Sequence, residues 1–124
     1  MPQSLVLVFL GGGIGSTGRY LISLLAASLF GDAFAWGTLA VNLGGCFVIG
    51  LLAGLADRSL ISREFRIFFV SGLLGGLTTF SSFSLETVRL MGTGLLGKAG
   101  LNIAANALLG LGLTALGLAA AARV

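Results

Sequence analysis

The sequence has little charge and few of the residues that build metal or thiol chemistry. Only 9% of its 124 residues are charged, whereas an average soluble domain has about 25%. It contains no histidine and one cysteine, Cys46, which excludes an internal disulfide and a cysteine–histidine metal site. A soluble domain so poor in charge would expose large apolar patches. Together with 56% hydrophobic residues and a mean hydropathy of +1.09, these absences favour lipid as the solvent.

The basic residues form no patch despite a formal net charge of +3. The seven lysines and arginines are spread along the whole chain, so they make no basic stripe of the kind that follows a phosphate backbone. We therefore expect no nucleic-acid partner.

Four apolar runs are long enough to cross a bilayer, which takes about 20 helical residues. They cover residues 5–30, 36–56, 65–90 and 99–122. The links between them are short and leave no room for a soluble domain. The first run has no basic segment before it and continues past residue 24, so we expect a retained helix and no cleaved signal peptide. The sequence predicts an all-α membrane protein with a single four-helix domain over residues 1–124.

Basic residues are almost balanced between the two sides of this bundle. The side with both termini and the second link holds Arg58, Arg63, Arg66 and Arg123, and the other side holds Arg19, Arg89 and Lys98. Because an excess of basic residues sets membrane orientation, a near-balance predicts insertion in both orientations and allows an antiparallel dimer. A single orientation selected by a weak bias is an equally good interpretation.

Glycine is abundant, at 21 residues. Three glycine pairs have the GxxxG spacing that lets membrane helices approach closely, at positions 11 and 15, 50 and 54, and 72 and 76. We expect these pairs to mark helix-packing faces.

Polar side chains lie inside two of the apolar runs, where they are expected to face a bundle interior or an aqueous path. Thr38 and Asn42 are one turn apart in the second run, and Asn102 and Asn106 are one turn apart in the fourth. We predict that these residues line a pore. The alternative is that they only join helices by hydrogen bonds of about 0.6 kcal/mol each.

The third run contains the segment SGLLGGLTTFSSFS at 71–84, which is poorly suited to a continuous helix. Adjacent glycines and adjacent threonines both weaken helices. A break here would free backbone carbonyls in the membrane, which is tolerated only where the backbone is buried in protein or lines a cavity. Freed carbonyls suit a hard cation such as Na⁺.

Two phenylalanines of this segment, Phe80 and Phe83, leave the same side of a helix and alternate with serines. An aromatic ring has a positive edge, so the pair could hold a small anion without a full positive charge. Contact with lipid or core is the alternative for both rings.

Arg19, Glu86 and Arg89 are charged residues within the predicted spans. Arg19 either extends to the interface or makes an electropositive vestibule for an anion. Glu86 and Arg89 are three residues apart, so we expect a local ion pair.

Three motifs, in this order, resemble the Fluc (CrcB) family of fluoride channels. They are GGGIGS at 11–16 followed by Arg19 and Tyr20, GTLAVNLGGCF at 37–47, and GGLTTFSSFS at 75–84. The resemblance covers essentially the whole chain. It implies a dual-topology antiparallel homodimer with two fluoride pores, whose third helix is broken near the membrane midplane.

The resemblance also implies roles for individual residues. Phe80 and Phe83 are the pore phenylalanines, and Asn42 is the pore asparagine. The other positions on the implied pore path are Thr38, Thr79, Ser81 and, in the vestibule, Arg19. Backbone carbonyls of Gly75 and Thr78 would hold a structural Na⁺ at the dimer interface. The fourth helix departs from the family pattern, since Asn102 and Asn106 take the place of a tyrosine and serine track.

The function implied is passive export of fluoride from the cytoplasm across the inner membrane of a bacterium, which relieves fluoride toxicity, with no enzymatic step. Two alternatives stay open. A small multidrug transporter has the same architecture but needs an acid in its first helix, and the first run here has none. A non-transporting structural subunit would use its polar residues only to join helices.

Overall fold

The computed structural model describes all residues, 1–124, and every regular element in it is helical. Two elements, α1 and α2, are long α-helices, and the shorter elements follow one another along the third and fourth helices. The elements are α1 (Pro2–Phe30), α2 (Trp36–Asp57), α3 (Arg63–Arg66), the π-helical η1 (Ile67–Leu74), α4 (Gly75–Leu77), α5 (Phe80–Gly92), α6 (Leu96–Ala104), the π-helical η2 (Ala105–Leu109) and α7 (Gly110–Ala121).

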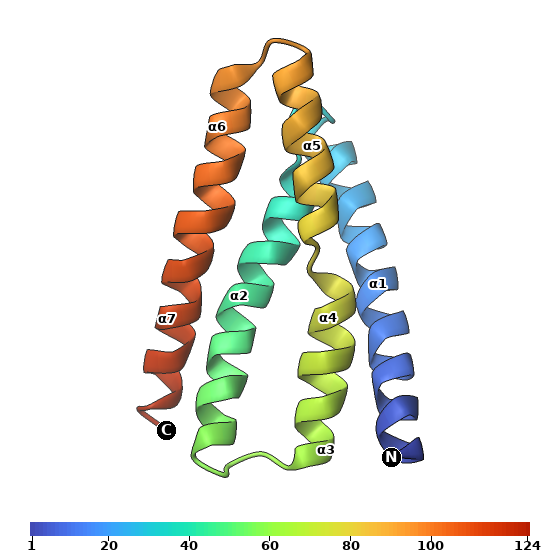
Figure 1. Ribbon diagram of the computed structural model, residues 1–124, viewed down its shortest axis with the longest axis vertical. Helices are drawn as coiled ribbons and strands as arrows, with labels where there is room; N and C mark the ends of the chain where they lie inside the picture. Colours follow the sequence, from blue (N-terminus) through green and yellow to red (C-terminus); the bar gives the residue numbers. More distant parts are fainter.

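These elements form four helices that are long and apolar enough to cross a membrane, Pro2–Phe30, Trp36–Asp57, Arg63–Gly92 and Leu96–Ala121. The predicted all-α architecture with four spans is confirmed. Both termini and the α2–α3 link lie at one end of the bundle, and the α1–α2 link and α5–α6 turn lie at the other (Figure 1). The fourth helix begins at Leu96 and not near residue 99, because the turn ends at Gly94, whose φ of 79° suits glycine.

Close glycine contacts join the helices in pairs, α1 with η1 and α4, and α2 with α7. A Cβ added at Gly11 would lie 2.5 Å from the Phe68 carbonyl oxygen, and one at Gly50 would collide with the backbone of Thr114. Gly54, Gly72 and the other members of the GxxxG pairs have comparable close neighbours on the facing helix. The prediction that these pairs mark packing faces is therefore confirmed.

The third span is broken between α4 and α5, as predicted. Thr78 and Thr79 are extended, with φ and ψ of −83° and 153°, and −152° and 121°. The two threonines lie at the centre of the span Arg63–Gly92, and Figure 1 shows the short non-helical link between α4 and α5. The break therefore falls at mid-depth of the bundle.

Two π-helical segments, η1 and η2, were not predicted. Such segments are frequent at functional sites, since the wider turn redirects side chains. Asn106 belongs to η2, and η1 leads into the broken part of the third span.

Candidate functional site

The break is held by Asn42 of α2. The Thr79 backbone N–H donates to Asn42 Oδ1 over 2.8 Å, and Asn42 Nδ2 donates to the Thr79 carbonyl oxygen over 3.1 Å. One side-chain amide therefore satisfies both backbone groups of Thr79, as a neighbouring peptide group would. This pairing explains how an extended residue is accommodated in the middle of an apolar span.

Several carbonyls at the break, including those of Gly75 and Thr78, lose the donors that a continuous α-helix would supply. In an α-helix the Thr79 N–H would bond to the Gly75 carbonyl and the Ser82 N–H to the Thr78 carbonyl. Here the first donates to Asn42, and the second donates to Thr79 Oγ1 over 3.1 Å. Carbonyl oxygens without an N–H partner suit a hard cation. The carbonyls of Gly75 and Thr78 therefore fit the Na⁺ ligands that the family resemblance implies.

Arg19 of α1 reaches the same break. Its Nε donates to the Gly76 carbonyl oxygen over 3.1 Å, and the side chain is half-buried. The Gly76 carbonyl, unlike those of Gly75 and Thr78, is thereby satisfied from α1. The guanidinium also places a positive charge beside the break, at mid-depth of the bundle.

A chain of side-chain hydrogen bonds joins Asn42 to the fourth helix. Asn42 Nδ2 donates to Asn106 Oδ1 over 3.0 Å, and Asn106 Nδ2 donates to the carbonyl and side-chain oxygens of Asn102 over 2.8 and 3.1 Å. Asn102 Nδ2 then donates to Thr87 Oγ1 over 2.9 Å, and this hydroxyl donates to the Phe83 carbonyl over 2.7 Å. The structure thus brings all three asparagines into one network.

An open groove of about 420 Å³ lies beside the break, and we call it the break groove. Its lining includes Asn42, Thr78, Thr79, Phe80, Phe83 and Asn106. Asn102 is only 1% exposed and does not reach the groove.

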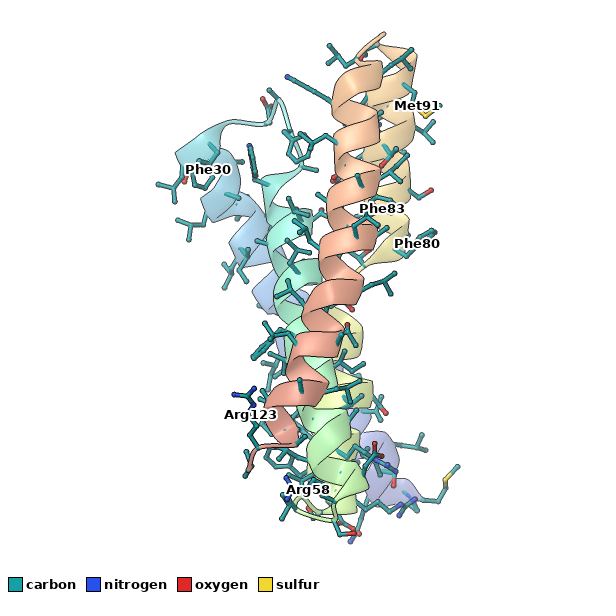
Figure 2. The ribbon with its side chains drawn as sticks, turned by 90° about the vertical axis from the view of Figure 1, so that its left-hand side faces the viewer. Phe30, Arg58, Phe80, Phe83, Met91 and Arg123 are labelled. Carbon is teal, nitrogen blue, oxygen red and sulfur yellow. The ribbon has the colours of Figure 1, made fainter.

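The two phenylalanine rings stand at the start of α5, with centroids 5.4 Å apart. Phe80 is 78% exposed and projects outward from the chain (Figure 2). Phe83 is half-buried against the groove. In one copy of the chain the outer ring therefore has no protein partner on its exposed side.

Two hydroxyls lie next to the rings. Thr79 Oγ1 and Ser81 Oγ share a hydrogen bond of 3.2 Å, and Thr79 Oγ1 also caps α5 by accepting from the Ser82 N–H. One hydroxyl proton of the Thr79–Ser81 pair therefore has no acceptor within the protein. Thr79 lines the break groove and Ser81 does not, so this proton lies at the groove in the arrangement in which Ser81 donates to Thr79.

Thr38 lies away from the break groove. It is 6% exposed, and its hydroxyl donates to Glu86 Oε1 over 2.7 Å, in a second cavity near the α1–α2 link. The predicted Glu86–Arg89 pair is wrong, since Glu86 Oε2 is buried without a hydrogen-bond partner. The Glu86 carboxylate bonds to Thr38 of α2 and not to Arg89 of its own helix. Its position as an acid inside an apolar span is the signal that could have marked it.

The fold and this site define a multi-pass membrane protein with a discontinuous helix, the kind of element that forms ion sites in transport proteins. The family model described as "CrcB-like protein, Camphor Resistance (CrcB)" matches residues 6–118. The chain belongs to this family, which sets the small multidrug alternative aside.

Several curated relatives are similar over most of their length, and each is named fluoride-specific ion channel FluC. The relative from Agrobacterium fabrum is 48% identical over 117 residues, which is 94% of each chain. Those from Rhizobium etli and Shewanella pealeana are 49% and 46% identical over 101 and 104 residues, 81% and 84% of each chain.

Proposed function

We propose that this protein is a fluoride-selective, passive ion channel and not an enzyme. The observation that carries the proposal is the break groove, where an unpaired hydroxyl proton, two phenylalanine rings and a nearby arginine meet at mid-depth of a four-span bundle. The names of the relatives support fluoride as the ion. The function follows from the residues at the break and needs no covalent step.

In this mechanism fluoride exchanges part of its water shell for donors on the protein. The free proton of the Thr79–Ser81 pair is one donor, and the positive edges of Phe80 and Phe83 add weaker attraction. Arg19 supplies a favourable potential without contact. Weak, successive sites of this kind admit an ion and also release it, as conduction requires.

We further propose that the working unit is an antiparallel, dual-topology homodimer with two pores. The exposed ring of Phe80 and the open side of the break groove are surfaces that a second copy would close. The carbonyls of Gly75 and Thr78 would hold Na⁺ at the interface between the copies. When bound, Na⁺ would compensate the carbonyl dipoles that the break leaves without N–H donors.

Passive flow of fluoride through the channel would let a cell export this anion. We propose that the protein lies in the inner membrane of a bacterium and releases fluoride that accumulates in the cytoplasm. No coupling ion is needed, because fluoride would move down its own electrochemical gradient.

Fluoride efflux from liposomes tests the proposal. Vesicles with purified protein are loaded with fluoride or chloride, K⁺ is shunted with an ionophore, and release is read with an ion-selective electrode. The Phe80→Ile variant is compared with Leu85→Ile, a matched change at an exposed position of the same helix. We expect fast fluoride efflux, no chloride efflux, and loss of efflux in Phe80→Ile only.

The particle size of each variant in detergent separates a channel from a structural subunit. Phe80→Ile keeps a large apolar side chain on the surface that the second copy would cover, so we expect this variant to leave the assembly intact. An intact dimer of the unchanged chain that passes no fluoride would refute the channel function. It would favour the structural-subunit alternative.

A further inference from the structure

The amide of Asn42 has no N–H left for an anion. An asparagine side chain has two N–H bonds, and here one is directed to the Thr79 carbonyl and the other to Asn106 Oδ1. Fluoride can therefore bind to Asn42 only if one of these two acceptors gives up its hydrogen bond. The pore role that the sequence predicts for Asn42 therefore depends on which acceptor leaves.

The bond to Thr79 is the harder one to break. Its loss would leave a backbone carbonyl unpaired at the centre of a membrane span, which costs several kcal/mol. The same amide also accepts from the Thr79 N–H, so the two groups are tied by two bonds. The single bond to the Asn106 side chain is the exchangeable one.

Asn106 presents only an oxygen to Asn42 and the break groove. Both of its own N–H bonds are directed to Asn102, at 2.8 and 3.1 Å. A carbonyl oxygen does not bind an anion, because it has a partial negative charge and no proton to donate. Asn106 is therefore placed as an acceptor that competes with fluoride and not as a fluoride ligand.

We propose that Asn106 Oδ1 is a stand-in acceptor, which holds the Asn42 N–H while the groove contains no anion and which fluoride displaces. This inference rests on the proposed fluoride channel function. It makes Asn106 a residue that sets affinity: each binding event must break one Asn42–Asn106 hydrogen bond, and its return favours release of the ion. The sequence interpretation of Asn106 as a fluoride ligand would predict the opposite effect on affinity.

Two substitutions at Asn106 separate these roles by the sign of their effects. Asn106→Leu keeps the branched shape and the number of side-chain heavy atoms and removes the competing oxygen, so we expect the half-saturating fluoride concentration for efflux to fall about threefold to tenfold, the range of one hydrogen bond. The maximal rate should fall as well, because release becomes slower. Asn106→Asp keeps the acceptor and adds negative charge, so its half-saturating concentration should rise.

Leu108→Ala is the matched control, since Leu108 lies on the same π-helical segment, is 70% exposed and belongs to no hydrogen bond of the network. Asn106→Ala replaces the leucine variant if the latter fails to form the wild-type particle in detergent. A half-saturating concentration that rises or stays unchanged in the apolar variants would overturn the inference while leaving the channel function in place. Absence of fluoride efflux from the unchanged chain would overturn both.

Discussion

The tight contact between α2 and α7 predicts a large effect from adding one methyl group at Gly117. A Cβ at this position would lie 2.7 Å from the Leu51 nitrogen and 3.1 Å from the Gly50 carbonyl carbon, and still closer to the Phe47 carbonyl oxygen. All three atoms are backbone and cannot rotate away. Because ordinary contact starts at 3.4 Å, α7 must move outward by at least 0.7 Å, the difference between 3.4 and 2.7 Å.

The magnitude follows from a comparison within the same helix. Gly112 also lies in α7, and a Cβ there would meet nothing within 4 Å. Either Gly→Ala change improves helix propensity by roughly 0.8–1.0 kcal/mol, so this effect cancels between them. Overpacking typically lowers stability by about 1–3 kcal/mol. We therefore expect Gly117→Ala to be about 1–3 kcal/mol less stable than Gly112→Ala.

The measurement is reversible unfolding in mixed micelles, followed by far-ultraviolet circular dichroism as the fraction of denaturing detergent increases. The two alanine variants and the unchanged chain are titrated in parallel. Equal midpoints for the two variants would refute the packing argument. A loss of stability in Gly112→Ala alone would show that a partner chain covers the outer face of α7.

Three further outcomes follow from single contacts. Thr79→Val removes the cap of α5 and should lower stability by about 1 kcal/mol, whereas Thr79→Ser should restore it, measured by the same titration. Arg58→Ala removes a hydrogen bond to the last turn of α7 and should lower stability by about 0.5–1.5 kcal/mol, the usual net contribution of one hydrogen bond; a larger loss would mean that the arginine also binds elsewhere. Thr38→Val leaves Glu86 without its donor and should destabilise the chain by about 1–3 kcal/mol, and the added change Glu86→Leu should recover part of this loss; no recovery would refute the pairing.

The features that could be predicted from the sequence depend on neighbours along the chain. Apolar runs identify spans because about 20 helical residues match the bilayer, whatever packs against them. The break at Thr78 and Thr79 follows from local helix weakness in GGLTT. The glycine pairs predicted packing faces, because only residues without a side chain let two backbones touch.

The features that could not be predicted depend on the relative positions of distant segments. Asn42 and Thr79 are 37 residues apart, and only the packing of α2 against the third span brings the amide to the break. The sequence marked all three asparagines as polar residues inside spans, but it could not tell which oxygen or N–H each would present. The orientation of each amide decides whether the side chain binds an anion, competes with it, or only joins two helices.

The prediction of a Glu86–Arg89 ion pair was wrong for the same reason, since the partner of Glu86 comes from a distant segment. The spacing of three residues favours a pair with Arg89 on one helix face, and this rule describes isolated helices in water. In the folded chain a hydroxyl from α2 lies within 2.7 Å of the carboxylate, and Arg89 is exposed. A donor fixed by tertiary packing requires no ordering of a long side chain, so it prevails over the local ion pair.

The polar groups at the break lie on an exposed face of the single chain, and this exposure supports the proposed homodimer. Gly75 and Ser81 are exposed, and Gly75 has lost the N–H donor that a continuous helix would give its carbonyl. A carbonyl without a donor is costly in lipid, by several kcal/mol, and irregular backbone persists only where protein or a cavity covers it. Lipid on this face would thus oppose the break that Asn42 stabilises from the other side. The homodimer proposed above would reconcile the two requirements, because a second copy of the chain would cover this face, give the exposed ring of Phe80 a partner and enclose the open groove.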